Sequence, residues 1–279
     1  MTAKQIVRVI RSHASKDGDG VNIQRVHGFN DSTFSPFLMI DELKSENPDD
    51  YVGGFPPHPH RGIETLTYML KGHFEHRDHM GNVGQLKSGG AQWMSAGKGV
   101  IHSEMPIVTE GGLHGFQIWI NLPAEKKRLP AKYHDFQSPE INEYGSEQNL
   151  LRVISGTLKE NDALREGPLQ DTGVETIVAD WRAAGGESRT LTIPAHYQTN
   201  LYVYKGEVKI GGDTVKAGHW VCLGDSDSVT LESVENAGVL ILAGQPIDEP
   251  VVHYGPFVMN SMDEINQAIA DYQNGVLTD

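Results

Sequence analysis

The chain contains a single cysteine, Cys222, among its 279 residues. A disulfide bond within the chain needs two cysteines, so this sequence excludes one. A reducing compartment suits such a chain best, because proteins of oxidising compartments commonly carry disulfides. We therefore expect a cytoplasmic protein. The apolar residues around Cys222 predict that its thiol is buried.

Long apolar runs and positive charge are also scarce. No stretch of 18 apolar residues is present, which argues against a membrane-spanning helix. The first residues lack the apolar core of a secretory signal. Acidic residues number 37 and basic residues 23, giving a formal net charge of −14. Because such a surface repels phosphate groups, we expect neither direct nucleic-acid binding nor a membrane partner.

Glycine and proline are plentiful, at 31 and 14 residues, and they separate short apolar runs. This pattern is typical of strands joined by turns, and it predicts an all-β protein. In the first half of the chain we expect strands over Ile6–Ile10, Val21–Val26, Ile63–Leu70, Ala91–Met94 and Phe116–Ile120.

A charged segment between Pro123 and Pro130 interrupts this pattern, and the residues up to about 148 show no period. The strand pattern then resumes, with Gly211-Gly212 as the turn of a hairpin. We expect strands over Leu151–Ile154, Glu175–Ala179, Arg189–Ile193, Leu201–Tyr204, Val208–Ile210, Val229–Leu231 and Val239–Leu242. Two successive β-units indicate a duplicated sandwich or barrel, with domains over residues 1–135 and 136–279.

The last segment changes to a helical period. Ser261 and Glu264 have the spacing of a capping box, in which each side chain satisfies a backbone N–H of the first turn. Ile265 and Ile269 follow at helical spacing, and Gly275 stands where a helix would end. We predict a short C-terminal helix within the second domain.

Two pairs of residues could bind a metal ion. His58 and His60 are two residues apart, as are His102 and Glu104, and alternate side chains of a strand point to the same face. Imidazole and carboxylate donors suit Fe, Mn, Ni, Cu or Zn, whereas a structural zinc site of the cysteine type is excluded. Glu64 has the same parity as His58 and His60, and both a ligand role and a non-ligand role remain open for it.

Other titratable residues give weaker indications of a functional site than these two pairs. The segment from His73 to His79 is dense in charge, and we expect it to be a solvated hairpin end. His196 and His219 lack a second histidine at metal-ligand spacing, so we expect both to be structural. Phe55 and Trp93 fit either a pocket mouth or a core.

Three stretches of the sequence resemble the pirin family of the cupin superfamily. They are the segments around His58 and His60, around His102 and Glu104, and the tail Gly255-Pro256-Phe257-Val258-Met259-Asn260. The resemblance implies a bicupin fold of two β-barrels. It also implies one metal, most often iron as Fe(II), in the N-terminal barrel, with His58, His60, His102 and Glu104 as its ligands.

The resemblance also suggests two functions. Bacterial pirins are linked with quercetin 2,3-dioxygenase activity, which cleaves a flavonol with O2, and Glu104 would then act as the catalytic base. Other pirins are described as non-catalytic, metal-dependent regulators that bind a transcription factor or a metabolic enzyme. The net charge favours a protein partner over DNA for this second function. No heptad pattern or apolar stripe is present, so we expect a monomer.

Overall fold

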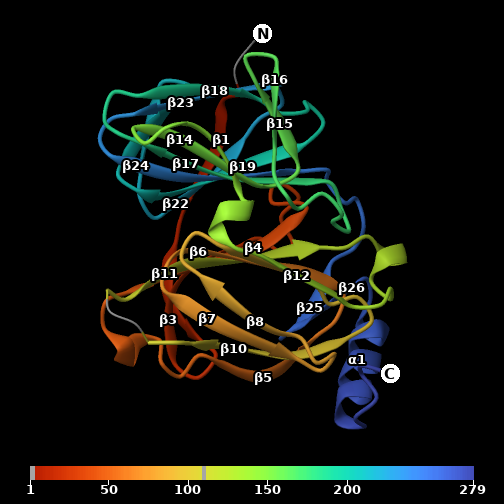
Figure 1. The fold of residues 1–279 in the computed structure, drawn as a ribbon. Coiled ribbons are helices and arrows are strands. Elements are labelled where there is room, and N and C mark those ends of the chain that lie inside the picture. Colours follow the sequence, from red (N-terminus) through yellow and green to blue (C-terminus); the bar gives the residue numbers. More distant parts are fainter. Residues whose placement is uncertain (1–3, 109–110) are drawn as a thin grey trace. The chain divides into compact units, whose positions relative to one another are not determined.

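The computed structural model describes residues 4–108 and 111–279. Within these ranges the chain consists mostly of antiparallel strands, and α1 (Met262–Gln273) is their one α-helix (Figure 1). The prediction of an all-β fold with a C-terminal helix is confirmed. In this described part of the chain, no helix has the length and apolar character needed to cross a membrane.

The chain divides into two compact units, each drawn from several segments. Residues 13–31, 37–139 and 247–279 form what we call the N-barrel unit, and residues 4–12, 32–36 and 140–246 form the C-barrel unit. These units differ from the predicted division at residue 135, because residues 4–12 and 32–36 belong to the C-barrel unit and residues 247–279 belong to the N-barrel unit. The first strand belongs to the C-barrel unit because it pairs there, and α1 belongs to the N-barrel unit because it packs there.

The N-barrel unit contains two main sheets. The larger sheet has the order β12 (Lys132–Phe136), β9 (Ala91–Ser95), β6 (Ile63–Lys71), β11 (Leu113–Asn121), β4 (Phe37–Ser45), β3 (Val21–His27) and β2 (His13–Asp17). The smaller sheet has the order β5 (Phe55–His60), β10 (Val100–Pro106), β7 (His73–Asp78) and β8 (Val83–Lys87). The remaining elements of this unit are β25 (Val252–Tyr254), β26 (Phe257–Met259) and the 3-10 turns η1 (Pro48–Asp50) and η2 (Ala124–Lys126).

The C-barrel unit has the same two-sheet plan. One sheet has the order β1 (Ile6–Arg11), β22 (His219–Leu223), β19 (Gln198–Lys205), β24 (Ala237–Gly244), β17 (Thr176–Ala183), β14 (Asn149–Ser155) and β13 (Asn142–Ser146). The other has the order β16 (Ala163–Glu166), β15 (Thr157–Glu160), β18 (Ser188–Thr192), β23 (Ser228–Ser233), β20 (Glu207–Ile210) and β21 (Asp213–Lys216). The 3-10 turn η3 (Ser138–Glu140) lies at the end of the segment between the units.

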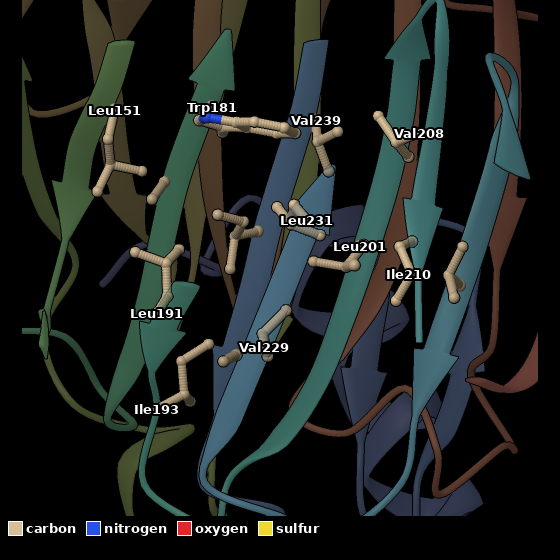
Figure 2. Packing of buried hydrophobic residues seen from close by; sticks show 14 of the residues in the cluster. Leu151, Trp181, Leu191, Ile193, Leu201, Val208, Ile210, Val229, Leu231 and Val239 are labelled. Carbon is tan, nitrogen blue, oxygen red and sulfur yellow. The ribbon is translucent and has the colours of Figure 1, made fainter. Parts of the chain in front are cut away.

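Aliphatic side chains and Trp181 fill the space between the two sheets of the C-barrel unit (Figure 2). Inward side chains such as Leu201 and Val239 are fully buried there. His196 is exposed, and His219 is half-buried with its Nδ1 3.0 Å from the carbonyl oxygen of Lys216. This cluster of buried side chains therefore offers no donor set comparable to that of the N-barrel unit.

Every strand predicted from the sequence overlaps an observed strand. The Gly211-Gly212 turn joins β20 to β21, and both glycines have positive φ angles, of +59° and +95°. Cys222 is buried, as predicted. Strand β4 was missed because Asp41 and Glu42 interrupt its apolar pattern. Both are buried and paired, Asp41 with Arg25 and Glu42 with His114.

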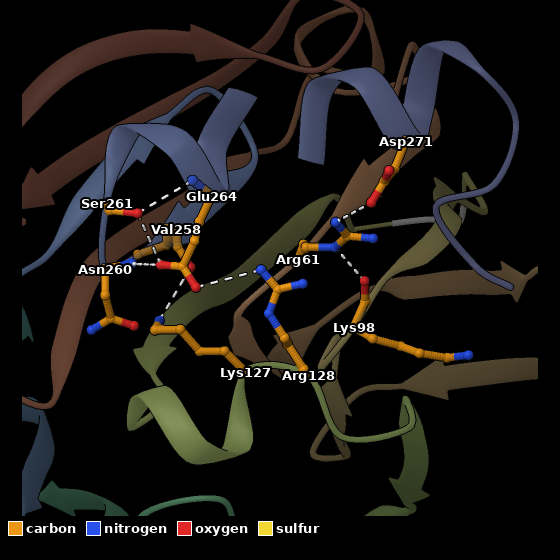
Figure 3. A network of polar contacts seen from close by, with 9 residues as sticks. All are labelled: Arg61, Lys98, Lys127, Arg128, Val258, Asn260, Ser261, Glu264 and Asp271. Atoms are coloured by element: carbon orange, nitrogen blue, oxygen red, sulfur yellow. Dashed lines mark hydrogen bonds and ion pairs between the residues drawn. The ribbon is translucent and has the colours of Figure 1, made fainter. Parts of the chain in front are cut away.

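Helix α1 begins as its capping signal predicts. The Ser261 side chain accepts a hydrogen bond from the Glu264 N–H, while Glu264 Oε2 accepts from the Asn260 N–H, one residue before the expected partner (Figure 3). The helix ends at Gln273 with Asn274 as its C-cap, and Gly275 follows with a φ of +72°. Ile265 is fully buried against β26 and its neighbours.

We expect Ser261→Ala to destabilise the N-barrel unit by about 1 kcal/mol, because it removes the acceptor for an N–H of the first helical turn. Ser261→Asp should restore most of the loss, since aspartate caps helices about as well as serine. Denaturant unfolding of the three proteins measures the difference. Equal destabilisation by both substitutions would contradict the capping role.

Candidate metal centre

The first part of the site is the edge strand β5, which pairs only with β10. Three prolines, Pro56, Pro57 and Pro59, lie in this strand, and proline suits an edge because it lacks an N–H donor. His58 and His60 share one face of the strand. Gly62, directly after it, turns the chain with a φ of +81°, and a Cβ there would lie 2.0 Å from the Val258 carbonyl oxygen.

Register places the second pair beside the first. His102 on β10 lies opposite His58 on β5 and opposite Asp78 on β7. Glu104 lies opposite His76 on β7. Because directly opposite residues of antiparallel strands share a face, these side chains all project to the same side of the small sheet.

Three of the predicted ligands form one cluster. The potential ligand atoms of His58, His60 and His102 lie within 4.8 Å of one another. Nδ1 of His58 lies 2.8 Å from the Pro56 carbonyl oxygen, and Nδ1 of His60 lies 3.2 Å from that of Pro256. A carbonyl only accepts, so both Nδ1 atoms carry the proton and both Nε2 atoms present a lone pair.

These Nε2 lone pairs suit a bound cation. Nε2 of His58 and Nε2 of His60 are only 3.1 Å apart, although neither has a proton to donate to the other. Nε2 of His102 is buried and has no hydrogen-bond partner. A buried acceptor without a partner costs free energy, and a metal ion between the three rings would satisfy all of them. The residues present therefore fit a metal ion.

Electrostatics keeps the three imidazoles neutral. Burial, with the nearby His58 acting in the same direction, lowers the pKa of His60 to about 3. Burial also lowers the pKa of His58, and it lowers that of His102 well below the usual range. Neutral imidazole is the form that binds metals, so these rings need not lose a proton near pH 7.

Glu104 lies in a second group of potential ligands, with His76 and His102. The two groups share His102, so the structure gathers all four predicted residues around one ring. Thr67 Oγ1 lies 3.0 Å from Glu104 Oε1, and the Gln117 amide donates to Oε2 at 3.2 Å. Burial raises the pKa of Glu104 to about 7, while these two hydrogen bonds oppose the rise.

His76 was missed by the sequence analysis. The expectation of a solvated hairpin end was wrong, because β7 runs through this segment and His76 is only 1% exposed. Its ring stacks on Tyr133 at 4.4 Å between centroids, with 21° between planes. The alternation of Phe74 and His76 with charged Glu75 and Arg77 was the available signal, since period two indicates a half-buried strand.

Glu64 is buried on β6 and belongs to neither group of potential ligands found among the described residues. It pairs across the sheet with Ser95 and Ile120, away from the small sheet that carries the histidines. Trp93 and Met94 are buried, and Phe55 lines the cavity described next.

A cavity of about 730 Å³ opens onto the cluster. Its lining includes the donors His58, His60 and Glu104, and a set of apolar and aromatic side chains that comprises Phe29, Met39, Phe55, Trp119 and His253. Phe29 and His253 stack at 4.0 Å with 11° between planes. The Trp119 ring meets the His60 ring edge-on at 5.1 Å. A flat apolar molecule could therefore lie between these rings and the potential metal ligands.

The cavity lining also includes charged side chains. Arg25 donates to both carboxylate oxygens of Asp41, at 2.7 and 2.6 Å, and also contacts Asp17. Burial disfavours the charge of Arg25, but the hydrogen bonds and charges of Asp41 and Asp17 outweigh it and raise the pKa of Arg25. The cavity thus combines apolar walls with a few fixed polar groups, which is typical of small-molecule sites.

Fold and site together define a bicupin protein in which the described residues hold two groups of potential metal ligands that share His102. The pirin family model matches residues 20–120, and the model of the pirin C-terminal cupin domain matches residues 178–278. Human pirin is 35% identical over 98% of this chain and 93% of its own length. The chain belongs to the pirin family.

Two relatives carry the name of an enzyme. A Vibrio cholerae protein with the provisional name quercetin 2,3-dioxygenase is 59% identical over 98% of this chain and 97% of its own length. A crystal structure of a quercetin 2,3-dioxygenase from Acinetobacter baumannii has a TM-score of 0.90 and 31% identity, and 99% of each chain is covered. A bacterial pirin of Escherichia coli solved with nickel(II) shares the fold, with a TM-score of 0.66 and 24% identity over 86% of this chain and all of that chain.

The raised pKa of Glu104 predicts how the stability of the metal-free protein depends on pH. Because the folded state holds this proton more tightly than the unfolded chain, stability falls as pH rises from the ordinary pKa of 4.5 to about 7. The shift corresponds to about 3 kcal/mol. We expect Glu104→Gln, which cannot ionise, to be more stable than the wild type at pH 8 by up to this amount, and to match it near pH 4.

Denaturant unfolding at both pH values, with a chelator present, measures this difference. Glu46→Gln is the control, since Glu46 is an exposed glutamate of the same unit. The prediction fails if the stability gain of Glu104→Gln is the same at pH 4 and pH 8.

Proposed function

We propose that this protein is a metal-dependent dioxygenase that opens the central ring of flavonols with O2 and releases carbon monoxide, the quercetin 2,3-dioxygenase reaction. The observation that carries the proposal is the cavity of about 730 Å³, which joins His58, His60 and Glu104 to an aromatic wall. The names of the Vibrio and Acinetobacter relatives support the same reaction.

The resident metal in this proposal is iron(II), held by His58, His60, His102 and Glu104. Three imidazoles and one carboxylate also accept manganese, nickel, copper or zinc, so the donor set fits a family of ions. When bound, the metal would act as a Lewis acid toward the flavonol 3-hydroxyl and would supply the electron chemistry for O2.

The cavity walls would orient the substrate. A flavonol is flat and aromatic, and it could lie against Phe29 and Trp119 with its hydroxyl groups directed to the donor cluster. Cavities of roughly 300–1,000 Å³ hold molecules of this size with most of their surface buried. The same burial would exclude bulk water from the reacting edge of the ring.

Glu104 is the proposed base for the 3-hydroxyl proton. It is buried among the potential metal ligands, and a carboxylate beside a bound metal can take the proton of a substrate hydroxyl group. Gln117 and Thr67 hold its two oxygens in place, so the proton-accepting atom is fixed in position. Acting as base requires Glu104 to loosen its contact with the metal.

The reaction can be tested directly. We expect anaerobic addition of quercetin to iron-loaded protein to shift the absorption spectrum of quercetin, and O2 to release carbon monoxide afterwards. His60→Ala should lose both effects together with the metal, because it removes a buried ligand. His196→Ala, an exposed histidine of the C-barrel unit, is the matched control and should keep them. A spectral shift without carbon monoxide would favour a binding role over catalysis.

The aromatic wall makes a second prediction. Phe29→Ala removes the ring that stacks on His253, and we expect the KM for quercetin to rise several-fold while kcat changes less, because the ring binds ground state and transition state alike. Tyr272→Ala changes a partly exposed ring outside the cavity and should leave both constants unchanged. Steady-state kinetics distinguishes the two variants. An unchanged KM for Phe29→Ala would remove this ring from the substrate site.

A further inference from the structure

We propose that His76 and Asp78 form a positioning pair that fixes the orientation and the protonated nitrogen of the metal ligand His102. This inference rests on the metal site of the proposed function, but it concerns two residues outside that ligand set. The pair is set up by β7, the strand that runs alongside β10.

The three side chains form a continuous line. Nδ1 of His102 lies 3.5 Å from Nδ1 of His76, and Nε2 of His76 lies 3.4 Å from Oδ2 of Asp78. The side chains of His76 and Asp78 are 1% and 0% exposed, so water does not compete along this line. The far end of the line, Nε2 of His102, is the buried atom that lacks a hydrogen-bond partner.

The Asp78 carboxylate sets the direction of hydrogen bonding along this line when His76 is neutral. A carboxylate accepts, so Nε2 of His76 carries a proton and donates it to Asp78. Nδ1 of the neutral His76 is then an acceptor, and Nδ1 of His102 must be its donor. This assignment leaves Nε2 of His102 with a free lone pair, which is the state that a metal ligand needs.

The pair is itself held rigidly. Asp78 accepts hydrogen bonds from the backbone N–H of Met80 at 2.9 Å and of Asn82 at 3.0 Å, and from the Asn82 side chain at 2.8 Å. The Tyr133 ring stacks on His76 and fixes the plane of the imidazole. The carboxylate therefore cannot swing away, and its charge acts on His102 through one imidazole.

Such a pair would strengthen metal binding in two ways. It selects the Nδ1–H form of His102 before the ion arrives, so no tautomer change is needed on binding. It also places a negative charge behind the ligand, which makes Nε2 a better donor. Outer partners of this kind commonly contribute roughly 10- to 100-fold to metal affinity.

The first experiment measures Zn²⁺ affinity by competition with a chelator. We expect Asp78→Asn and His76→Phe each to weaken Zn²⁺ binding roughly 10- to 100-fold. The phenylalanine keeps the stack on Tyr133, and the asparagine keeps acceptors for the Met80 and Asn82 N–H groups, so both variants should fold. Glu75→Gln is the control, because Glu75 is on the same strand but pairs with Arg77 instead, and it should bind Zn²⁺ as the wild type does.

The second experiment identifies the tautomers by nitrogen-15 NMR of histidine side chains in the zinc-loaded protein. We expect His102 to carry its proton on Nδ1 and His76 on Nε2. Of these two rings, His102 alone should show a metal-induced shift, at Nε2. Asp78→Asn should alter the His76 signals. A metal-induced shift at His76 itself would overturn the inference, because that ring would then be a ligand.

The two proposals fail in different ways. If the wild type binds no Zn²⁺, the metal site itself is refuted, and this inference with it. If the wild type binds Zn²⁺ and both variants bind it equally well, only the positioning pair is refuted. Neither measurement uses a flavonol, so neither depends on the identity of the substrate.

Discussion

The site depends on one constraint, the burial of imidazole nitrogens whose lone pairs face one another. His58 and His60 present their Nε2 atoms to each other at 3.1 Å, and both Nδ1 atoms are occupied by backbone carbonyls. Without a cation, this arrangement leaves buried acceptors unsatisfied and is costly. The register of β5, β10 and β7 nevertheless maintains it. A bound cation would be coordinated by these lone pairs, and the same arrangement would then stabilise the folded protein.

The C-terminal segment of the N-barrel unit helps to hold the histidines in this arrangement. The carbonyl of Pro256 fixes the proton of His60, and the next residues tie the segment to the strand that carries His60. Arg61 donates to Asp271 at 2.6 Å and also contacts the Lys98 carbonyl (Figure 3). It donates to the Leu277 carbonyl at 3.2 Å as well. Lys127 is buried and donates to the carbonyl oxygens of Gly62 and Val258. Helix α1 thus anchors the segment that orients His60, a proposed metal ligand.

Local pattern was enough to predict part of the site. His58 with His60 and His102 with Glu104 follow the period of a strand, so the parity of each pair was readable from the sequence. Their meeting depends on register between strands about 40 residues apart, which only the family resemblance suggested. The role of His76 required knowing that β7 lies beside β10. The hydrogen-bond partner of His60 is the backbone carbonyl of Pro256, almost 200 residues away in the sequence. Because every residue has a backbone carbonyl, the residue type could not identify this partner.

The two units share a two-sheet arrangement but bury different kinds of side chain. In the C-barrel unit the space between the sheets is filled by Leu, Val, Ile and Trp side chains, which gain free energy simply by leaving water (Figure 2). The N-barrel unit has apolar clusters of its own, but it also buries histidines, Glu104 and Asp78. Desolvation lowers the pKa of His60 and His102 and raises that of Glu104. Such groups add little to stability by themselves. Their burial is explained if a bound ligand compensates for the free energy that desolvation costs. Metal binding should therefore stabilise the N-barrel unit far more than the C-barrel unit.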